Sequence, residues 1–338
     1  MTTKHPIALV TAALAVSLST MIAVITPVPA SAARPTDSPN PTLLHAGLEG
    51  GSGSTVGPDG ALYVPESAAG RISRVDPNTG DTTTFASGLP KSLVGFGGAM
   101  DVQFIGHTAY VLVTLVASDV GGSDVVGIYR VDGPDSFTVV ADIGAFSKAN
   151  PPKTPFDLET GVQYALETYR GGFLVTDGHH NRVLRVTRHG EVTELIGFDN
   201  IVPTGLALQG DKVYMAEAGP VPHMAADGKV VSFGPKSSTA TEIASGAPLL
   251  VDVEFGRGRA LYALSQGVFG GGPPASPASP NTGSLVKVNG DGTFTTVADG
   301  LDRPTSLEFI GNTAYIVTLT GEIWKVDGTS CPSYRMAR

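Results

Sequence analysis

Beyond about residue 40 the chain consists of short runs in which apolar and polar residues alternate, separated by Gly, Pro, Asn and Asp. Alternation with a period of two is typical of β-strands, because successive side chains of a strand point to opposite faces of the sheet. Only the stretch from Asp142 to Asn150 is predicted to form a helical turn. The pattern therefore predicts an all-β protein with tight turns.

The alternating runs recur in sets of four. One run reads GRISRV at 70–75, VGIYRV at 126–131, NRVLRV at 181–186, GKVVSF at 228–233, GSLVKV at 283–288 and GEIWKV at 321–326. A second run precedes each of these, as in ALYVPE and AYIVT, and a third precedes that one, as in MDVQF and VDVEF. A fourth run follows each of the first five, as in TTTFASGL. Four strands per repeat, with a period of roughly fifty residues, predict the blades of a β-propeller.

The sixth repeat lacks a fourth strand at its own end, because the residues after GEIWKVDG, TSCPSYRMAR, do not alternate. The segment PTLLHAGL, Pro41 to Leu48, matches the missing pattern. We therefore predict a six-bladed β-propeller of four-stranded antiparallel blades over residues 41–328, closed by the N-terminal strand (about 41–48), which completes the last blade. Closure of this kind removes the unpaired strand edges that promote aggregation.

The N-terminal region has the features of a secretory signal. An apolar run from Ile7 to Ile25 is followed by Pro27, Pro29 and the small residues Ala30-Ser31-Ala32, a pattern typical of a cleavage site. An uncleaved membrane anchor is the alternative, since a span needs roughly 17–25 residues. The predicted organisation is a signal peptide over 1–32, a linker over 33–40 and a C-terminal tail over 329–338, which makes the mature protein secreted and extracellular, with no stable membrane insertion after cleavage.

Charge and cysteine content restrict the partners. The chain has 22 Lys and Arg against 31 Asp and Glu, a net charge of −9, and loss of Lys4 with the signal makes it −10. This balance disfavours nucleic acid, whose binding depends on basic residues. The only cysteine, Cys331, lies in the tail, so no internal disulfide is expected and a monomer is favoured over a Cys331-linked dimer. The expected partner is a small molecule, a glycan or another secreted protein.

Propeller topology sorts the loops onto two faces. Connections between blades emerge on the same face as the loops between the second and third strands of each blade, and several of these segments are long: 117–125, 219–229, 267–283 and the connection that begins at Asp142. We call this side the loop-rich face. Long loops on a rigid scaffold often carry binding residues, so the function is expected on this face.

Five acidic residues are candidates for the channel mouth on the loop-rich face. Glu66, Asp177 and Glu217 end second strands, whereas Asp101 and Asp252 lie on the first strands of blades two and five, on opposite sides of the ring. Converging carboxylates could bind a hard cation through oxygen ligands, or could separate their pKa values and act as acid and base. The alternative is that each carboxylate caps its own loop through backbone N–H groups.

Three histidines are candidates on the same face. His179 and His180 lie in the loop between the second and third strands of blade three, and His223 lies in the matching loop of blade four. With Asp177 or Glu217 they contain the ligand types of a zinc site. Adjacent histidines on a tight turn point apart, however, and no compact ligand spacing is present. We therefore favour solvated turns over zinc ligands.

The order of motifs, from GPDGALYVPESAAGRISRVDPNTG through ADIGAFSKANPP and LVTDGHHNRVLRVTRHGEVTEL to PTSLEFIGNTAYIVT, resembles the secreted ScyD/ScyE family of NHL-like propellers. The resemblance covers about Pro41 to Gly328. It implies an exported six-bladed propeller and brings no catalytic residues with it.

Two classes of function remain. The first is a secreted binding or accessory protein that holds its ligand on the loop-rich face at the mouth of the central channel. The second is a metal-dependent hydrolase, lactonase or lyase with a divalent cation, Ca or Zn, at that mouth. The sequence contains no G-x-S-x-G elbow, no H-E-x-x-H pair and no nucleotide-binding glycine fingerprint. The first class is favoured, because a propeller fold hosts both roles and only its site can decide between them.

Overall fold

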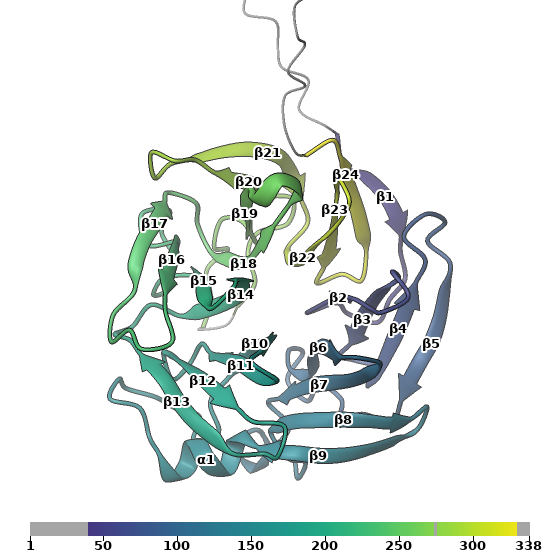
Figure 1. Cartoon of the computed structure of the whole chain (residues 1–338), viewed down its shortest axis with the longest axis vertical. Helices are drawn as coiled ribbons and strands as arrows, with labels where there is room; N and C mark the ends of the chain where they lie inside the picture. Colours follow the sequence, from purple (N-terminus) through teal and green to yellow (C-terminus); the bar gives the residue numbers. More distant parts are fainter. Residues whose placement is uncertain (1–39, 274–275, 330–338) are drawn as a thin grey trace, which may run out of the picture. The chain divides into compact units, whose positions relative to one another are not determined.

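Each sequence repeat folds into one four-stranded antiparallel sheet, and six such sheets stand around a central axis (Figure 1). The computed structural model describes residues 40–273 and 276–329. The predicted signal peptide, the predicted linker up to residue 39 and the tail from residue 330, including Cys331, lie outside the described residues. The predicted six-bladed propeller is confirmed.

The strands of a blade follow the chain from the channel outward. Blade 1 contains β2 (Thr55–Val56), β3 (Leu62–Glu66), β4 (Arg71–Val75) and β5 (Thr82–Ser87); blade 2 contains β6 (Gly98–Ile105), β7 (Thr108–Thr114), β8 (Gly127–Gly133) and β9 (Ser136–Asp142); and blade 3 contains β10 (Gln163–Tyr169), β11 (Gly172–Asp177), β12 (Arg182–Val186) and β13 (Val192–Gly197).

The second half of the ring repeats this arrangement. Blade 4 contains β14 (Pro203–Gln209), β15 (Lys212–Glu217), β16 (Lys229–Phe233) and β17 (Thr241–Ser245); blade 5 contains β18 (Leu250–Phe255), β19 (Leu261–Ser265), β20 (Gly283–Val288) and β21 (Phe294–Leu301); and blade 6 contains β22 (Pro304–Ile310), β23 (Thr313–Thr318), β24 (Ile323–Asp327) and β1 (Thr42–His45).

The N-terminal strand closes the ring as the sequence predicts. β1 pairs antiparallel with β24, with Leu43 opposite Trp324, and the Leu48 amide donates to the Gly321 carbonyl at 3.1 Å. The first and last strands of the propeller therefore belong to one sheet, so that unfolding either end exposes the edge of the other.

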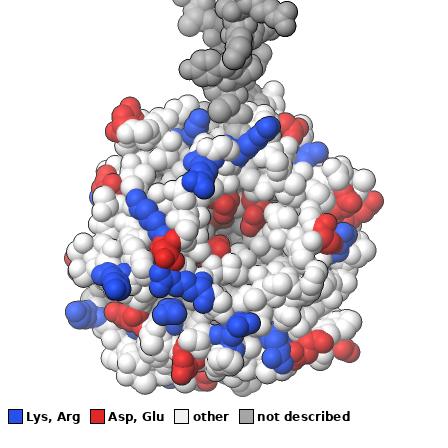
Figure 2. Space-filling view, in the orientation of Figure 1, with Lys and Arg blue, Asp and Glu red and all other residues white. Residues whose placement is uncertain are grey.

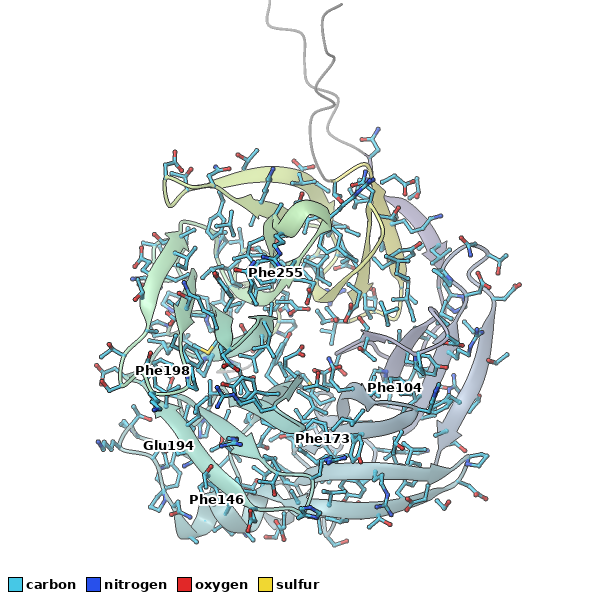
Figure 3. The ribbon with its side chains drawn as sticks, viewed as in Figure 1. Phe104, Phe146, Phe173, Glu194, Phe198 and Phe255 are labelled. Carbon is cyan, nitrogen blue, oxygen red and sulfur yellow. The ribbon has the colours of Figure 1, made fainter. Side chains whose placement is uncertain are left out.

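The core lies between the blades. Six clusters of buried apolar side chains are found among the described residues, and each joins two neighbouring sheets. Figure 3 labels aromatic members of four interfaces, Phe104, Phe173, Phe198 and Phe255. These strands are apolar on both faces because each sheet packs against a neighbour on either side.

Two short helical elements bear on the site. The connection between blades 2 and 3 forms α1 (Ile143–Ala149), capped by the Asp142 carboxylate, which accepts from the Ala145 amide at 2.7 Å. This confirms the one predicted helical turn. A 3-10 turn, Ser118–Val120, lies in the loop of blade 2. Over the described residues, no helix is long and apolar enough to cross a membrane.

Candidate functional site

The first strand of each blade places side chains in the channel at two levels. Each of these strands runs from the loop-rich face to the opposite face, where a short turn leads to the second strand. Strand pairing aligns Asp101 with Asp252 and Ser306 at the upper level, nearer the loop-rich face. Two residues further on, the lower level holds Gln103, Glu167, Glu254 and Glu308.

At the upper level, Asp101 and Asp252 connect neighbouring blades. Oδ2 of Asp101 accepts from the Leu166 amide of blade 3 at 2.7 Å, and Oδ2 of Asp252 accepts from the Leu307 amide of blade 6 at 2.7 Å. The other oxygen of each accepts from the following amide of its own strand at 2.8 Å. Bulges in β10 and β22 precede the two donor amides. Both carboxylates are therefore occupied by backbone N–H groups.

Glycine makes room for these two aspartates. A Cβ atom at Gly53 would lie 2.1 Å from Asp101 Oδ1, and one at Gly205 would lie 2.3 Å from Asp252 Oδ1. Gly53 belongs to the blade before Asp101, and Gly205 belongs to the blade before Asp252. The sequence thus uses the same Gly-then-Asp arrangement twice, on opposite sides of the ring.

The lower level is rich in acidic side chains without basic neighbours. The residues of both levels line a cavity of about 30 Å³, and none of the lining residues is Lys, Arg or His. Burial raises the pKa of Glu167 and of Asp252 to about 7. Burial and neighbouring carboxylates hold the pKa values of Glu254 and Glu308 well above the usual range. Figure 2 shows acidic side chains at the centre of the ring. The volume suits roughly one water molecule rather than an organic ligand.

Tyr164 crosses the channel above these two levels. It lies near the start of β10 in blade 3, and its hydroxyl donates to the Thr305 carbonyl of blade 6, on the opposite side, at 3.3 Å. The ring of Phe96, from the connection between blades 1 and 2, stacks on Tyr164 with centroids 6.5 Å apart. The Tyr164 side chain therefore links blade 3 to blade 6 across the channel, with the Phe96 ring beside it.

The second-strand acids lie one strand away from the channel. Glu66, Asp177 and Glu217 each stand directly opposite a basic residue at the start of the third strand, namely Arg71, Arg182 and Lys229. None of the three acids lines the channel cavity. Their convergence with Asp101 and Asp252 on one point is therefore not observed, because a second strand cannot reach past the first.

The Glu66 carboxylate accepts hydrogen bonds from three residues. Arg71 donates to both carboxylate oxygens at 2.8 and 2.7 Å, Ser73 donates to one of them, and the Glu49 amide donates to the other at 2.6 Å. Burial alone would raise the pKa of Glu66, but these donors and the charge of Arg71 lower it overall. Glu66 therefore acts as the loop cap that the sequence offered as its alternative role.

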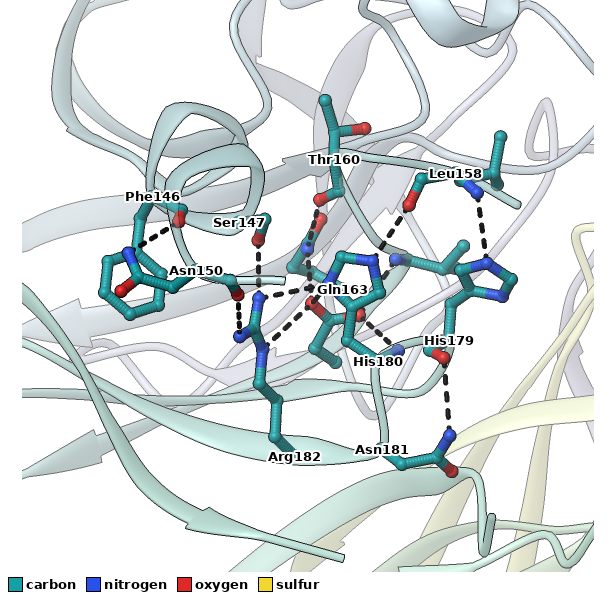
Figure 4. Close-up of polar contacts among 12 residues, drawn as sticks. Phe146, Ser147, Asn150, Leu158, Thr160, Gln163, His179, His180, Asn181 and Arg182 are labelled. Atoms are coloured by element: carbon teal, nitrogen blue, oxygen red, sulfur yellow. Dashed lines mark hydrogen bonds and ion pairs between the residues drawn. The ribbon is translucent and has the colours of Figure 1, made fainter. Parts of the chain in front are cut away.

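Asp177 is the centre of a larger buried network, and Figure 4 labels its partners Gln163, His180 and Arg182. Its carboxylate accepts from the Val162 amide at 3.0 Å and from Gln163 Nε2 at 3.1 Å, and it lies 3.2 Å from His180 Nδ1 and 3.7 Å from Arg182 Nε. Burial alone would raise its pKa, but the His180 side chain and the Arg182 charge beside it lower it. The network holds the connection between blades 2 and 3 against blade 3.

Arg182 reaches that connection directly, and only 1 % of it is exposed. Its Nη1 donates to the Asn150 carbonyl at 2.7 Å, and its Nη2 donates to Ser147 Oγ at 2.9 Å. The guanidinium also lies over the Phe146 ring at 5.5 Å. The buried Arg182 guanidinium therefore holds helix α1 against blade 3.

The side chains of the two adjacent histidines form hydrogen bonds with the connection between blades 2 and 3. His179 Nε2 accepts from the Asp157 and Leu158 amides at 2.8 and 3.1 Å, and His180 Nε2 donates to the Leu158 carbonyl at 2.9 Å. Burial lowers the pKa of His179. The favoured solvated turn is therefore wrong for His180, which is 2 % exposed. The reason is that the long connection folds over this turn and covers it.

Glu217 differs from the other two second-strand acids. Its expected partner Lys229 donates instead to Glu242 Oε2 on β17 at 2.8 Å, and no hydrogen bond to the Glu217 carboxylate is found among the described residues. The residue is only 6 % exposed. Burial raises its pKa to about 7, against the opposing effect of the Lys229 charge. Glu217 is thus a buried carboxyl that stands at the loop-rich face and can exchange a proton near neutral pH.

His223 follows Glu217 in the same loop and is 6 % exposed. Its Nδ1 bonds to the Gly219 carbonyl at 2.7 Å, and its ring meets Phe269 of blade 5 edge-to-face, with centroids 5.4 Å apart. His223 therefore ties two neighbouring loops together.

In the part of the chain that the structure describes, no group of three His, Cys, Asp or Glu side chains has the geometry to hold a metal ion. The zinc and calcium candidates of the sequence are thus not brought together there. Sequence reasoning missed Glu167, Glu254 and Glu308. Their signal was the acidic residue two positions after the Asp101 and Asp252 column, as in VDVEF and TSLEF.

Comparisons with known proteins place the fold among six-bladed propellers. The chain is similar to a virginiamycin B lyase from Staphylococcus aureus, with 16% identity and a TM-score of 0.53, over 85% of this chain and 98% of that one. It is similar to a PQQ-bound aldose sugar dehydrogenase from Streptomyces coelicolor, with 14% identity and a TM-score of 0.58, over 85% and 96%. It is also similar to a gluconolactonase from Xanthomonas campestris, with 11% identity and a TM-score of 0.60, over 85% and 89%.

No known family profile matches the sequence, and no curated protein matches it. At these identities the structural likeness establishes the fold alone. The three similar structures named above are a lyase, a dehydrogenase and a gluconolactonase.

Proposed function

We propose that the protein is a hydrolase or lyase that acts on a small molecule at the loop-rich mouth of the propeller, with Glu217 as its acid–base group. The observation that carries the proposal is a buried carboxyl with a pKa of about 7 and no hydrogen bond among the described residues. A general acid or base works best when its pKa lies near the operating pH. The lactonase and lyases of the same fold support this class of chemistry.

The neighbouring groups support a single acid–base residue. Glu66 and Asp177 are paired with Arg71 and Arg182, whereas Lys229 is paired with Glu242. Among the described residues, no counter-ion contacts Glu217. Of the three equivalent acids, only Glu217 therefore has a pKa near 7. The proposal needs no metal step, and a divalent cation enters the test as a variable.

The proposal is tested by turnover. The full chain is assayed at pH 7.5 against lactones and esters, with and without Ca²⁺ or Zn²⁺, beside Glu217→Gln. Removal of a general acid or base typically costs about 10²–10⁴ in rate, so we expect a loss of that size in kcat with little change in fold. Glu191→Gln, an exposed carboxylate on the opposite face, is the matched control and should keep full activity.

A second candidate is the non-catalytic binding or accessory propeller. It is favoured by the closed bonding of Glu66 and Asp177, which leaves few free polar groups on the loop-rich face. If no substrate in the panel is turned over, or if Glu217→Gln is as active as the wild type, the acid–base proposal is rejected and the binding propeller is retained.

We also propose that the protein is secreted and belongs with the ScyD/ScyE-like propellers, on the basis of its N-terminal segment and its motif order. Mass spectrometry of protein from a secreting host should find an N-terminus at Ala33. Retention of residues 1–32 in a membrane fraction would show an anchor instead.

A further inference from the structure

Exposed apolar side chains gather on the loop-rich face. Eight large apolar side chains are exposed among the described residues, and two of them, Leu43 and Val139, lie on outermost strands. The other six are in connections or loops of the loop-rich face: Leu93, Val94, Phe156, Val221, Met224 and Val268. Apolar surface concentrated on one face of a soluble protein commonly marks a binding site.

Three of these residues form what we call the apolar lip: Val221, Met224 and Val268, which are 45%, 58% and 57% exposed. Val221 and Met224 belong to the loop that follows Glu217, and Val268 belongs to the neighbouring loop of blade 5. The contact between His223 and Phe269 joins the two loops. The lip and the Glu217 carboxyl therefore belong to one corner of the mouth.

The blade-5 loop of the lip contains no charged side chain. The sequence from Gln266 to Thr282 has no Asp, Glu, Lys or Arg. Leu93 and Val94 come from the connection between blades 1 and 2, across the ring from blades 4 and 5, and Phe96 of the same connection stacks on the Tyr164 ring. Apolar side chains thus stand on two sides of the ring at this mouth, and Glu217 ends the strand that leads into one of the two loops of the lip.

We propose that the ligand of the loop-rich mouth is a predominantly apolar small molecule that carries one polar reactive group, such as a lactone or ester with a hydrocarbon chain. This substrate class rests on the proposed function of Glu217. Burial of hydrocarbon against the lip is favourable in proportion to the area removed from water. A polyhydroxylated sugar would instead leave buried hydroxyls without partners, which is costly. The ligand thus differs from that of a sugar-specific site.

Binding is measured on Glu217→Gln, which holds a ligand without turning it over. Calorimetric titrations compare γ-dodecalactone, γ-butyrolactone and gluconolactone. A buried methylene contributes about fourfold in affinity. Burial of two to three methylenes of its eight-carbon chain should therefore make γ-dodecalactone bind about thirtyfold more tightly than γ-butyrolactone. The double substitution Met224→Ser and Val268→Ser should weaken γ-dodecalactone by about tenfold and leave γ-butyrolactone unchanged.

The matched control is Leu43→Ser with Val139→Ser, which removes equally exposed apolar side chains from the outermost strands. It should leave all three affinities unchanged. The substrate-class proposal is overturned if the three compounds bind equally, if gluconolactone binds best, or if both double variants weaken binding alike. Tight binding of γ-dodecalactone without turnover by the wild type would retain the apolar ligand and reject the acid–base function, so the two failures are distinguishable.

Discussion

At the scale of single residues, the partner across the hairpin decides what an acid does. Glu66, Asp177 and Glu217 occupy equivalent strand ends, and each faces a basic residue. The first two are held in ion pairs, with pKa values below the usual range. The third loses its partner Lys229 to Glu242, and burial then raises its pKa to about 7. Blade 3 has the equivalent carboxylate, Glu194, 3.6 Å from Arg182, but Arg182 also stays beside Asp177. The position of the cation thus separates the two ion-paired acids from Glu217.

The alignment of repeats predicted the strand positions of these acids but not their ion-pair partners. Sequence alone showed that Asp177 and Glu217 end equivalent strands. It did not show that Lys229 pairs with Glu242 rather than with Glu217, because a long flexible lysine side chain can reach either carboxylate. It also could not show that the connection after Asp142 folds back over His179 and His180, since that depends on the conformation of a long loop.

The buried Arg182 gives a stability prediction. Arg182→Leu leaves Asp177 charged and buried without its cation, which should cost about 3–5 kcal/mol in the free energy of unfolding. The measurement is urea denaturation at pH 7. Arg185→Leu changes an exposed arginine of the same strand and should cost less than about 0.5 kcal/mol. Equal losses in both variants would contradict the role of the buried network.

His179 gives a pH prediction. The fold binds its neutral form, because Nε2 accepts two amide hydrogens, and its pKa is lowered. The unfolded chain therefore binds more protons, so stability should fall as pH drops from about 6.5 through the lowered pKa of the folded state. His179→Gln should flatten this part of a plot of melting temperature against pH. An unchanged slope in that variant would show that other groups cause the loss.

At the scale of strands and helices, the alternating pattern was highly informative. It predicted the closing strand β1, because a period of two is a strong local signal, and the one expected helical turn forms the short helix α1. It did not reveal the bulges in β10 and β22 that free the Leu166 and Leu307 amides for the two channel aspartates. A bulge depends on the fit of neighbouring blades, and a single strand does not show it.

The closing strand gives a prediction with a built-in reporter. The only tryptophan of the chain, Trp324, lies on β24 opposite Leu43 of β1. Deletion of residues 41–46 should expose β24, shift Trp324 fluorescence to longer wavelength and lower the melting temperature. A deletion of equal length over residues 33–38, before the first strand, serves as the control. Unchanged Trp324 fluorescence in the first variant would contradict closure by β1.

At the scale of the whole molecule, the ring gathers acidic side chains at its centre at a cost in stability. The pKa values of Glu167 and Asp252 are raised to about 7, and those of Glu254 and Glu308 lie well above the usual range. The folded state therefore binds more protons than the unfolded chain, and stability is lost as pH rises from about 4.3 through these values. This dependence of stability on pH has the opposite sign to the one expected from His179.

Removal of two central charges tests this effect. Glu254→Gln with Glu308→Gln should raise the melting temperature at pH 8 and leave it nearly unchanged at pH 4, where the native carboxyls are protonated. Glu159→Gln with Glu191→Gln, two exposed carboxylates, is the control and should change neither value. A pair of central substitutions that destabilises the protein at pH 8 would show that these carboxylates hold the ring together.

The central claim concerns the protonation of Glu217, and carbon-13 NMR of its side-chain carboxyl measures it without a substrate. The resonance is assigned by its absence in Glu217→Gln and followed from pH 3 to pH 9. We expect a midpoint near 7 in the wild type and a lower midpoint in Glu242→Gln, where Lys229 is released to pair with Glu217. A wild-type midpoint near the ordinary glutamate value of about 4.3, unchanged in Glu242→Gln, would contradict the account.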